Sequence, residues 1–117
     1  MAKVYEFLAN GFEEVEALAP VDILRRGGVE VKMVSITGSN LVESSHGVVV
    51  KADLLFENIT DFSDADLLML PGGMPGSKNL NEHDGVRNAL KEQFEKGKRV
   101  AAICAAPLVL ASVGLLK

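Results

Sequence analysis

Cys104 is the one cysteine of this 117-residue sequence, and it stands where a thiol could act as a nucleophile. Residues 99–103 form an apolar-rich run typical of a strand, and Pro107 suits a first helical turn because its φ is preset and it lacks an N–H. A cysteine between strand and helix faces the unpaired amides and the positive end of the helix dipole, which favour thiolate over thiol. Cysteine is also commonly a small core residue. The end of a strand is where α/β folds place their sites, and this favours the functional interpretation.

Three acidic residues near the amino terminus are further candidates. Glu13, Glu14 and Glu16 begin a segment with helical periodicity. Their ordinary role would be an acidic first turn that complements the helix dipole. Glu16 follows Val15 by one position, so we expect it at the edge of the buried helix face, where a carboxyl group could take part in proton transfer.

A glycine pair, Gly72-Gly73, follows an apolar strand and Pro71. Glycines there let the backbone approach a ligand or another loop closely, although the same pattern is typical of a plain strand-ending turn. The two histidines, His46 and His83, are scattered, and His46 is expected on the surface at a hairpin turn. With a single cysteine they offer no metal-site spacing and no internal disulfide.

Composition limits the class of protein. The chain is 48% hydrophobic and 24% charged with a net charge of -4, which suits one soluble domain with its own core. Its apolar runs are too short and too often charged for a membrane span, and its start does not fit a signal peptide. The acidic balance, the lack of Trp and the single Tyr leave no basic, aromatic-lined surface for nucleic acid. We therefore expect a cytoplasmic protein.

The elements that must position these groups alternate between strand and helix. Strands are expected at 3–9, 29–36, 65–70 and 99–104, helices at 13–26, 85–95 and from 107 onward, with a small hairpin over 41–50. This order predicts a flavodoxin-like, doubly wound α/β fold, in which helices cover both faces of a mostly parallel sheet. No repeat or linker interrupts it, so residues 1–117 are expected to form a single domain.

Helical spacing also predicts which faces are buried. On the first helix, Phe12, Val15, Ala19 and Ile23 share one face. On the helix over 85–95, Val86, Leu90 and Phe94 do so, with Asp84 as the expected cap.

Four segments together resemble the ThiJ/PfpI superfamily. They are Gly-Phe-Glu-Glu-Val-Glu at 11–16, Pro-Val-Asp-Ile-Leu-Arg-Arg at 20–26, Leu-Pro-Gly-Gly at 70–73 and Ala-Ala-Ile-Cys-Ala-Ala-Pro at 101–107. The match runs in register from near residue 3 to near residue 114, and it is closest to the branch that contains the parkinsonism-associated protein deglycase. The resemblance implies a sheet like that of class I glutamine amidotransferases.

The resemblance also implies a site. Cys104 matches the family's nucleophile, Glu16 the glutamate that contacts its sulfur, and Gly73 and Ala105 the residues whose backbone amides bind an oxyanion. Two convergent N–H groups can stabilise an oxyanion, a thiolate or an oxidised sulfur. A carboxyl group buried beside a thiolate favours its protonated form and can then donate a hydrogen bond. No metal and no cofactor are implied.

The sequence departs from the family pattern in two ways. Protease-like and heat-shock-chaperone members carry a histidine directly after the nucleophile, where this chain has Ala105. Many members also carry a histidine well beyond the cysteine, which neither His46 nor His83 matches, and they are longer than 117 residues. We therefore expect the domain to be truncated, with a C-terminal segment of the same gene product packing against it.

The implied function is that of a glyoxalase III or protein deglycase, which acts without cofactor on methylglyoxal-like α-oxoaldehydes or their early adducts. The alternative is a redox-sensing, chaperone-like protein of the oxidative stress response, in which Cys104 becomes oxidised. A cysteine protease is disfavoured by Ala105, and thiazole monophosphate biosynthesis by the absence of a Walker-type phosphate loop. The resemblance further implies a homodimer that uses the first helix and the hairpin.

Overall fold

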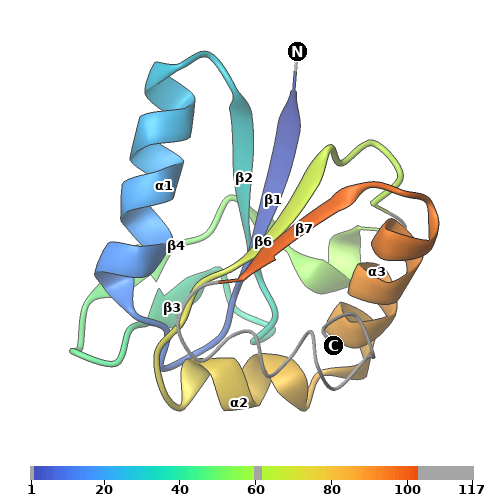
Figure 1. The fold of residues 1–117 in the computed structure, drawn as a ribbon. Coiled ribbons are helices and arrows are strands. Elements are labelled where there is room, and N and C mark those ends of the chain that lie inside the picture. Colours follow the sequence, from blue (N-terminus) through green and yellow to red (C-terminus); the bar gives the residue numbers. More distant parts are fainter. Residues whose placement is uncertain (1, 60–61, 103–117) are drawn as a thin grey trace.

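A parallel sheet organises the computed structural model, which describes residues 2–59 and 62–102 (Figure 1). Its elements follow in the order β1 (Lys3–Leu8), α1 (Glu14–Arg26), β2 (Glu30–Ser35), β3 (Leu41–Glu43), β4 (Val49–Lys51), β5 (Leu54–Leu55), the 3-10 turn η1 (Phe56–Asn58), β6 (Leu67–Leu70), α2 (Gly76–Asn81), α3 (Asp84–Glu95) and β7 (Arg99–Ala102).

The main sheet has five strands in the order β5-β2-β1-β6-β7 within the described residues, and every neighbouring pair is parallel. Strands β3 and β4 form a separate antiparallel hairpin. Helix α1 connects β1 to β2 on one side of the strand order, and α3 connects β6 to β7 on the other. The expected mostly parallel, doubly wound α/β fold is confirmed.

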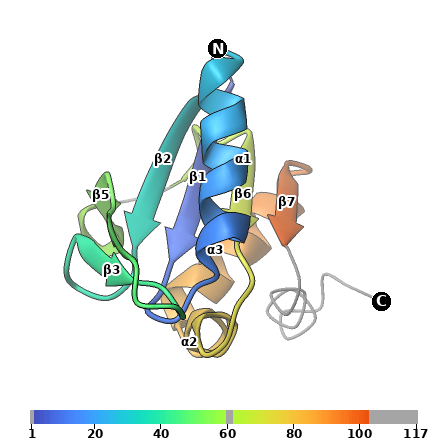
Figure 2. The same cartoon turned by 90° about the vertical axis from the view of Figure 1, so that its left-hand side faces the viewer.

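Helices cover both faces of this sheet, as Figure 2 shows with α1 in front of the strands and α3 behind them. Alternation along β1 sends side chains to both layers. Tyr5 and Phe7 belong to the core cluster under α3, whereas Val4 and Leu8 belong to the cluster under α1. Both layers are buried, and each large apolar side chain removed from water contributes about 1.5–3 kcal/mol.

The predicted buried face is wrong for most of α1 and wrong at one position of α3. On α1, Ala17 and Val21 are buried against the sheet, while Val15 and Ile23 are each 67% exposed. Ala19 is exposed as well, although Phe12 is buried as expected. This helix carries apolar residues on both sides, so periodicity identified the helix but not the side that the sheet covers.

On α3, Val86 and Leu90 are buried as predicted, but Phe94 is 51% exposed. The buried position at that end is Gln93, whose amide donates to the backbone oxygens of Ala65 and Arg99. A satisfied amide can replace an apolar side chain in the core because its hydrogen bonds offset the loss of water.

The cap of α3 also differs from the prediction. His83, rather than Asp84, is the N-cap residue, and its Nδ1 accepts from the backbone N–H of Val86 at 3.1 Å. The predicted helix from residue 107 onward lies outside the described residues. Within them, no helix is long and apolar enough to cross a membrane.

Candidate active site

The carboxyl ends of the central strands meet at one edge of the sheet, beside α2 (Figure 1). In the register of β6 and β7, Leu70 lies opposite Ala102, so the two strands end together. Strand β7 therefore leads the chain to the loop that follows β6. Cys104 and Ala105 lie outside the described residues, and their roles stay predictions. The strand predicted over 99–104 is confirmed for Arg99–Ala102.

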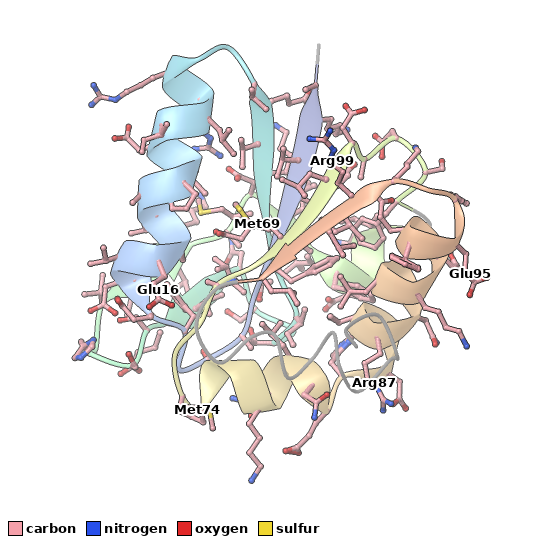
Figure 3. The ribbon with its side chains drawn as sticks, in the orientation of Figure 1. Glu16, Met69, Met74, Arg87, Glu95 and Arg99 are labelled. Carbon is pink, nitrogen blue, oxygen red and sulfur yellow. The ribbon has the colours of Figure 1, made fainter. Side chains whose placement is uncertain are left out.

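Helix α1 brings Glu16 to the same edge. The helix begins after Glu13, whose carboxylate caps it by accepting from the backbone N–H of Val15 at 2.7 Å. Glu16 lies in the first turn, where it is partly buried and its Oε1 atom is shielded from solvent. Figure 3 shows Glu16 at the end of α1 that lies nearest the carboxyl edge of the sheet.

Gly73 packs directly against the start of α1. Its φ is +98°, a conformation that side chains rarely adopt, and a Cβ added to it would lie 2.5 Å from the backbone N of Glu13. One residue earlier, the oxygen of Gly72 accepts from the N–H of Glu13 at 2.9 Å. Glycine at position 73 therefore permits a close backbone approach, and this approach brings the first turn of α1 and the loop after β6 together.

Helix α2 makes further contacts with the loop after β1. The N–H of Gly76 donates to the oxygen of Gly11 at 3.0 Å, and the side-chain amide of Asn79 donates to the oxygen of Asn10 at 2.8 Å. The side-chain oxygen of Asn10 in turn accepts from the N–H of Glu43 in the hairpin. The loop after β1 is thus hydrogen-bonded both to α2 and to the hairpin.

The structure also places His46 beside α1, which the sequence did not reveal. Its Nδ1 lies 2.9 Å from a carboxylate oxygen of Glu14, and the imidazole is exposed, as expected of a hairpin turn. The hydrogen bond to Glu14 raises the pKa of His46. The pKa of Glu14 is lowered, mainly by a backbone N–H and secondarily by His46. A contact across 32 positions of sequence has no local signal.

Glu13, Glu14 and His46 each offer one possible metal-ligand atom within 4.8 Å of the others. The carboxylate of Glu13 already caps α1, and the imidazole of His46 is already bound to Glu14. The positive end of the α1 dipole also opposes a cation at this position. We therefore assign no metal to this cluster.

Comparisons with known proteins agree with this architecture. A solved structure of oxidized DJ-1 from Toxoplasma gondii has a TM-score of 0.94 and 39% identity, over 99% of this chain and 63% of that chain. Protein DJ-1 homolog A of Arabidopsis thaliana is 42% identical over 94% of this chain, which spans 28% of that protein. A protein named deglycase from Thermococcus kodakarensis is 38% identical over 98% of this chain and 68% of that protein.

This chain thus spans less than two thirds of the Toxoplasma and Arabidopsis proteins that it matches. A model of the DJ-1/PfpI family matches residues 2–117, nearly the whole sequence. Together with the strong likeness to DJ-1 structures, this match shows that the chain belongs to the DJ-1/PfpI family, in the branch of the DJ-1 homologues.

Proposed function

We propose that this chain contributes the sheet edge that carries the catalytic residues of a cofactor-free, cysteine-dependent enzyme of the glyoxalase III or deglycase type. Its substrates would be α-oxoaldehydes such as methylglyoxal, or their early adducts with proteins and nucleotides. The observation that carries the proposal is the packing of Gly73 against Glu13, three positions before Glu16, at the edge to which β7 leads the chain. The name of the Thermococcus relative supports the same class of reaction.

In the proposed reaction, the thiolate of Cys104 attacks the aldehyde carbon of methylglyoxal and forms a carbon–sulfur bond. The carbonyl oxygen becomes an oxyanion held by the amides of Gly73 and Ala105, and it takes up a proton from solvent water to give a hemithioacetal. Glu16 then removes the proton from that carbon and returns it to the neighbouring keto carbon, while the hydroxyl proton passes to the keto oxygen, and this leaves a thioester of a 2-hydroxy acid. Water hydrolyses the thioester, releases lactate and restores the thiol.

A steady-state assay tests this proposal. The gene product that contains these residues, at its natural length, is incubated with methylglyoxal, and lactate formation is followed without added metal or thiol cofactor. We expect turnover by the wild type and its loss in Cys104→Ser, because a serine hydroxyl is a far weaker nucleophile than a thiolate at neutral pH. Equal turnover by both proteins would reject the role of Cys104.

A second candidate is a redox sensor, and the description of the Toxoplasma structure as oxidized favours considering it. Two equivalents of peroxide would oxidise the Cys104 thiolate through a sulfenate to a sulfinate, with peroxide reduced to water at each step. Glu16 and the same backbone amides would hold the oxidised sulfur. Rapid reaction with peroxide in a protein that does not turn over methylglyoxal would favour this alternative.

We also propose two partners for the chain. The first is a second copy, bound through the exposed apolar side of α1, where Val15 and Ile23 stand in solvent, together with the hairpin residues Val48 and Val49. The second is a C-terminal segment of the same gene product. The matched Toxoplasma structure is longer than this chain, and such a segment would cover the edge of β7 that no described strand pairs with.

A further inference from the structure

One carboxyl group lies inside the sheet, away from the candidate site. Glu6 occupies the middle of the central strand β1 and is 0% exposed. Neither carboxyl oxygen has a hydrogen-bond partner among the described residues. A buried polar group without a partner is costly even when neutral, and an ionised one is much more so.

The surroundings of Glu6 are apolar. In the sheet register it lies between Met33 of β2 and Met69 of β6. Both methionines belong to the buried cluster that also contains Ala17 and Val21 of α1. Figure 3 shows Met69 between α1 and the strands. The carboxyl group is therefore enclosed at the interface between α1 and the sheet, where thioethers and methyl groups cannot replace the water that a carboxylate needs.

Arg25 of α1 is the charged group that acts on Glu6, but it forms no hydrogen bond with the Glu6 carboxyl group. Arg25 favours the ionised form through space, but its guanidinium Nη2 donates at 2.8 Å to Asp53 and to the backbone oxygen of Val31. The partly buried acids of α1, Glu14 and Glu16, both lie in its first turn. Burial dominates and raises the pKa of Glu6 to about 9, from an ordinary value of 4.5.

We propose that the packing of α1 against the sheet depends on the protonation of Glu6. Helix α1 packs over the neutral carboxyl group, so the chain takes up one proton at Glu6 when it folds near neutral pH. Loss of this proton places a bare carboxylate in an apolar interface, and α1 loosens so that water can enter. Because the N–H of Glu13 is bonded to the oxygen of Gly72, loosening also separates the first turn of α1 from the loop after β6.

The sign of the linkage follows from the direction of the shift. Below pH 4.5 the carboxyl group is protonated in both the folded and the unfolded chain, so its contribution does not vary with pH. Between 4.5 and about 9 the unfolded chain has lost the proton and the folded chain keeps it. The equilibrium constant for folding therefore falls about tenfold per pH unit across this interval.

The first experiment measures urea unfolding of the wild type, Glu6→Gln and Glu6→Met at several pH values from 5 to about 8.5. Relative to either variant, the wild type should lose about tenfold in folding equilibrium constant per pH unit. Glu92→Gln, which removes an exposed carboxyl group on α3, should keep the slope of the wild type. A wild type and a Glu6→Met variant with the same slope would overturn the proposal.

Two measurements keep the test decisive if a variant folds poorly. The carboxyl carbon resonance of Glu6 in the wild type, assigned through the backbone, should titrate well above pH 7, and titration near 4.5 would refute a neutral Glu6. Amide hydrogen exchange in α1, taken relative to α3 so that the intrinsic pH dependence cancels, should lose at least tenfold protection between pH 7 and about 9.5. Unchanged relative protection would show that the packing of α1 does not depend on the protonation of Glu6.

Discussion

Gly73 shows how one residue type can set the geometry of a site. Its positive φ and its closeness to the backbone of Glu13 both exclude a side chain. We predict that Gly73→Ala destabilises the fold by more than about 1–3 kcal/mol, the usual cost of one strained residue, because the backbone of Glu13 must also move. Gly28→Ala is the matched control, since Gly28 has a φ of +85° but nothing within 4 Å of an added Cβ. Urea unfolding of both variants checks this, and equal losses would mean that the contact with Glu13 costs nothing.

Glu16 is proposed to move a proton between two substrate carbons. Glu16→Gln keeps the shape of the side chain and its ability to donate a hydrogen bond, but it cannot accept the proton. We expect the fold to be retained and methylglyoxal turnover to fall by roughly 10²-fold or more. Asp22→Asn removes an exposed acid of the same helix, bonded to Arg26, and should retain turnover. Wild-type rates in Glu16→Gln would remove Glu16 from the mechanism.

Cys104 is proposed to be ionised at neutral pH. Because the sequence has a single cysteine, ultraviolet absorbance of the thiolate reports on this residue alone. We predict a transition below the value of about 8.5 for a free thiol, since helix amides and the dipole would stabilise the anion. A transition at or above that value would indicate a structural cysteine.

At the scale of elements, the sequence was sufficient for the order of β1, α1, β2, β6, α3 and β7 because their patterns are local, whereas the two-residue strand β5 is too short to leave such a pattern. The runs that became β1, β2, β6 and β7 are apolar and bounded by glycine, proline or charge, and the intervening helices have helical periodicity. Parallel connection then requires the carboxyl ends of these strands to lie at one edge. The closeness of the start of α1 to the loop after β6 was therefore predictable, and the structure shows it in the contact between Gly73 and Glu13. The roles of Glu16 and Gly73 in a site stay predictions.

The faces of the helices were not predictable in the same way. Helix α1 is apolar on both sides, so spacing alone cannot tell whether Val15 and Ile23 or Ala17 and Val21 meet the sheet. The burial of Glu6 was not predicted for a related reason. A charged residue in a strand is ordinarily expected in solvent, but both faces of a central parallel strand are covered, so Glu6 is buried whichever way its side chain points. Such outcomes depend on tertiary packing rather than on local sequence.

At the scale of the whole molecule, α1 has one side on the sheet and an apolar side in solvent. A contiguous apolar surface of this kind is typical of a binding face. The proposed occupant is a second copy, because a twofold arrangement lets the same surface pair with itself. Val15 and Ile23 would lie in the interface, and Val15 belongs to the same first turn as Glu16.

Ile23→Asp tests this assembly. Because Ile23 is 67% exposed in the single chain, its replacement should change the free energy of unfolding of one subunit by no more than about 0.5 kcal/mol. In a dimer it would bury an unpaired charge, which should weaken self-association by at least roughly 100-fold. Sedimentation velocity over a range of concentrations measures this. Phe94→Asp, at a half-exposed position on α3 over the opposite face of the sheet, should still dimerise. A wild type that is monomeric at micromolar concentration, or an Ile23→Asp variant that dimerises like the wild type, would contradict the proposed interface.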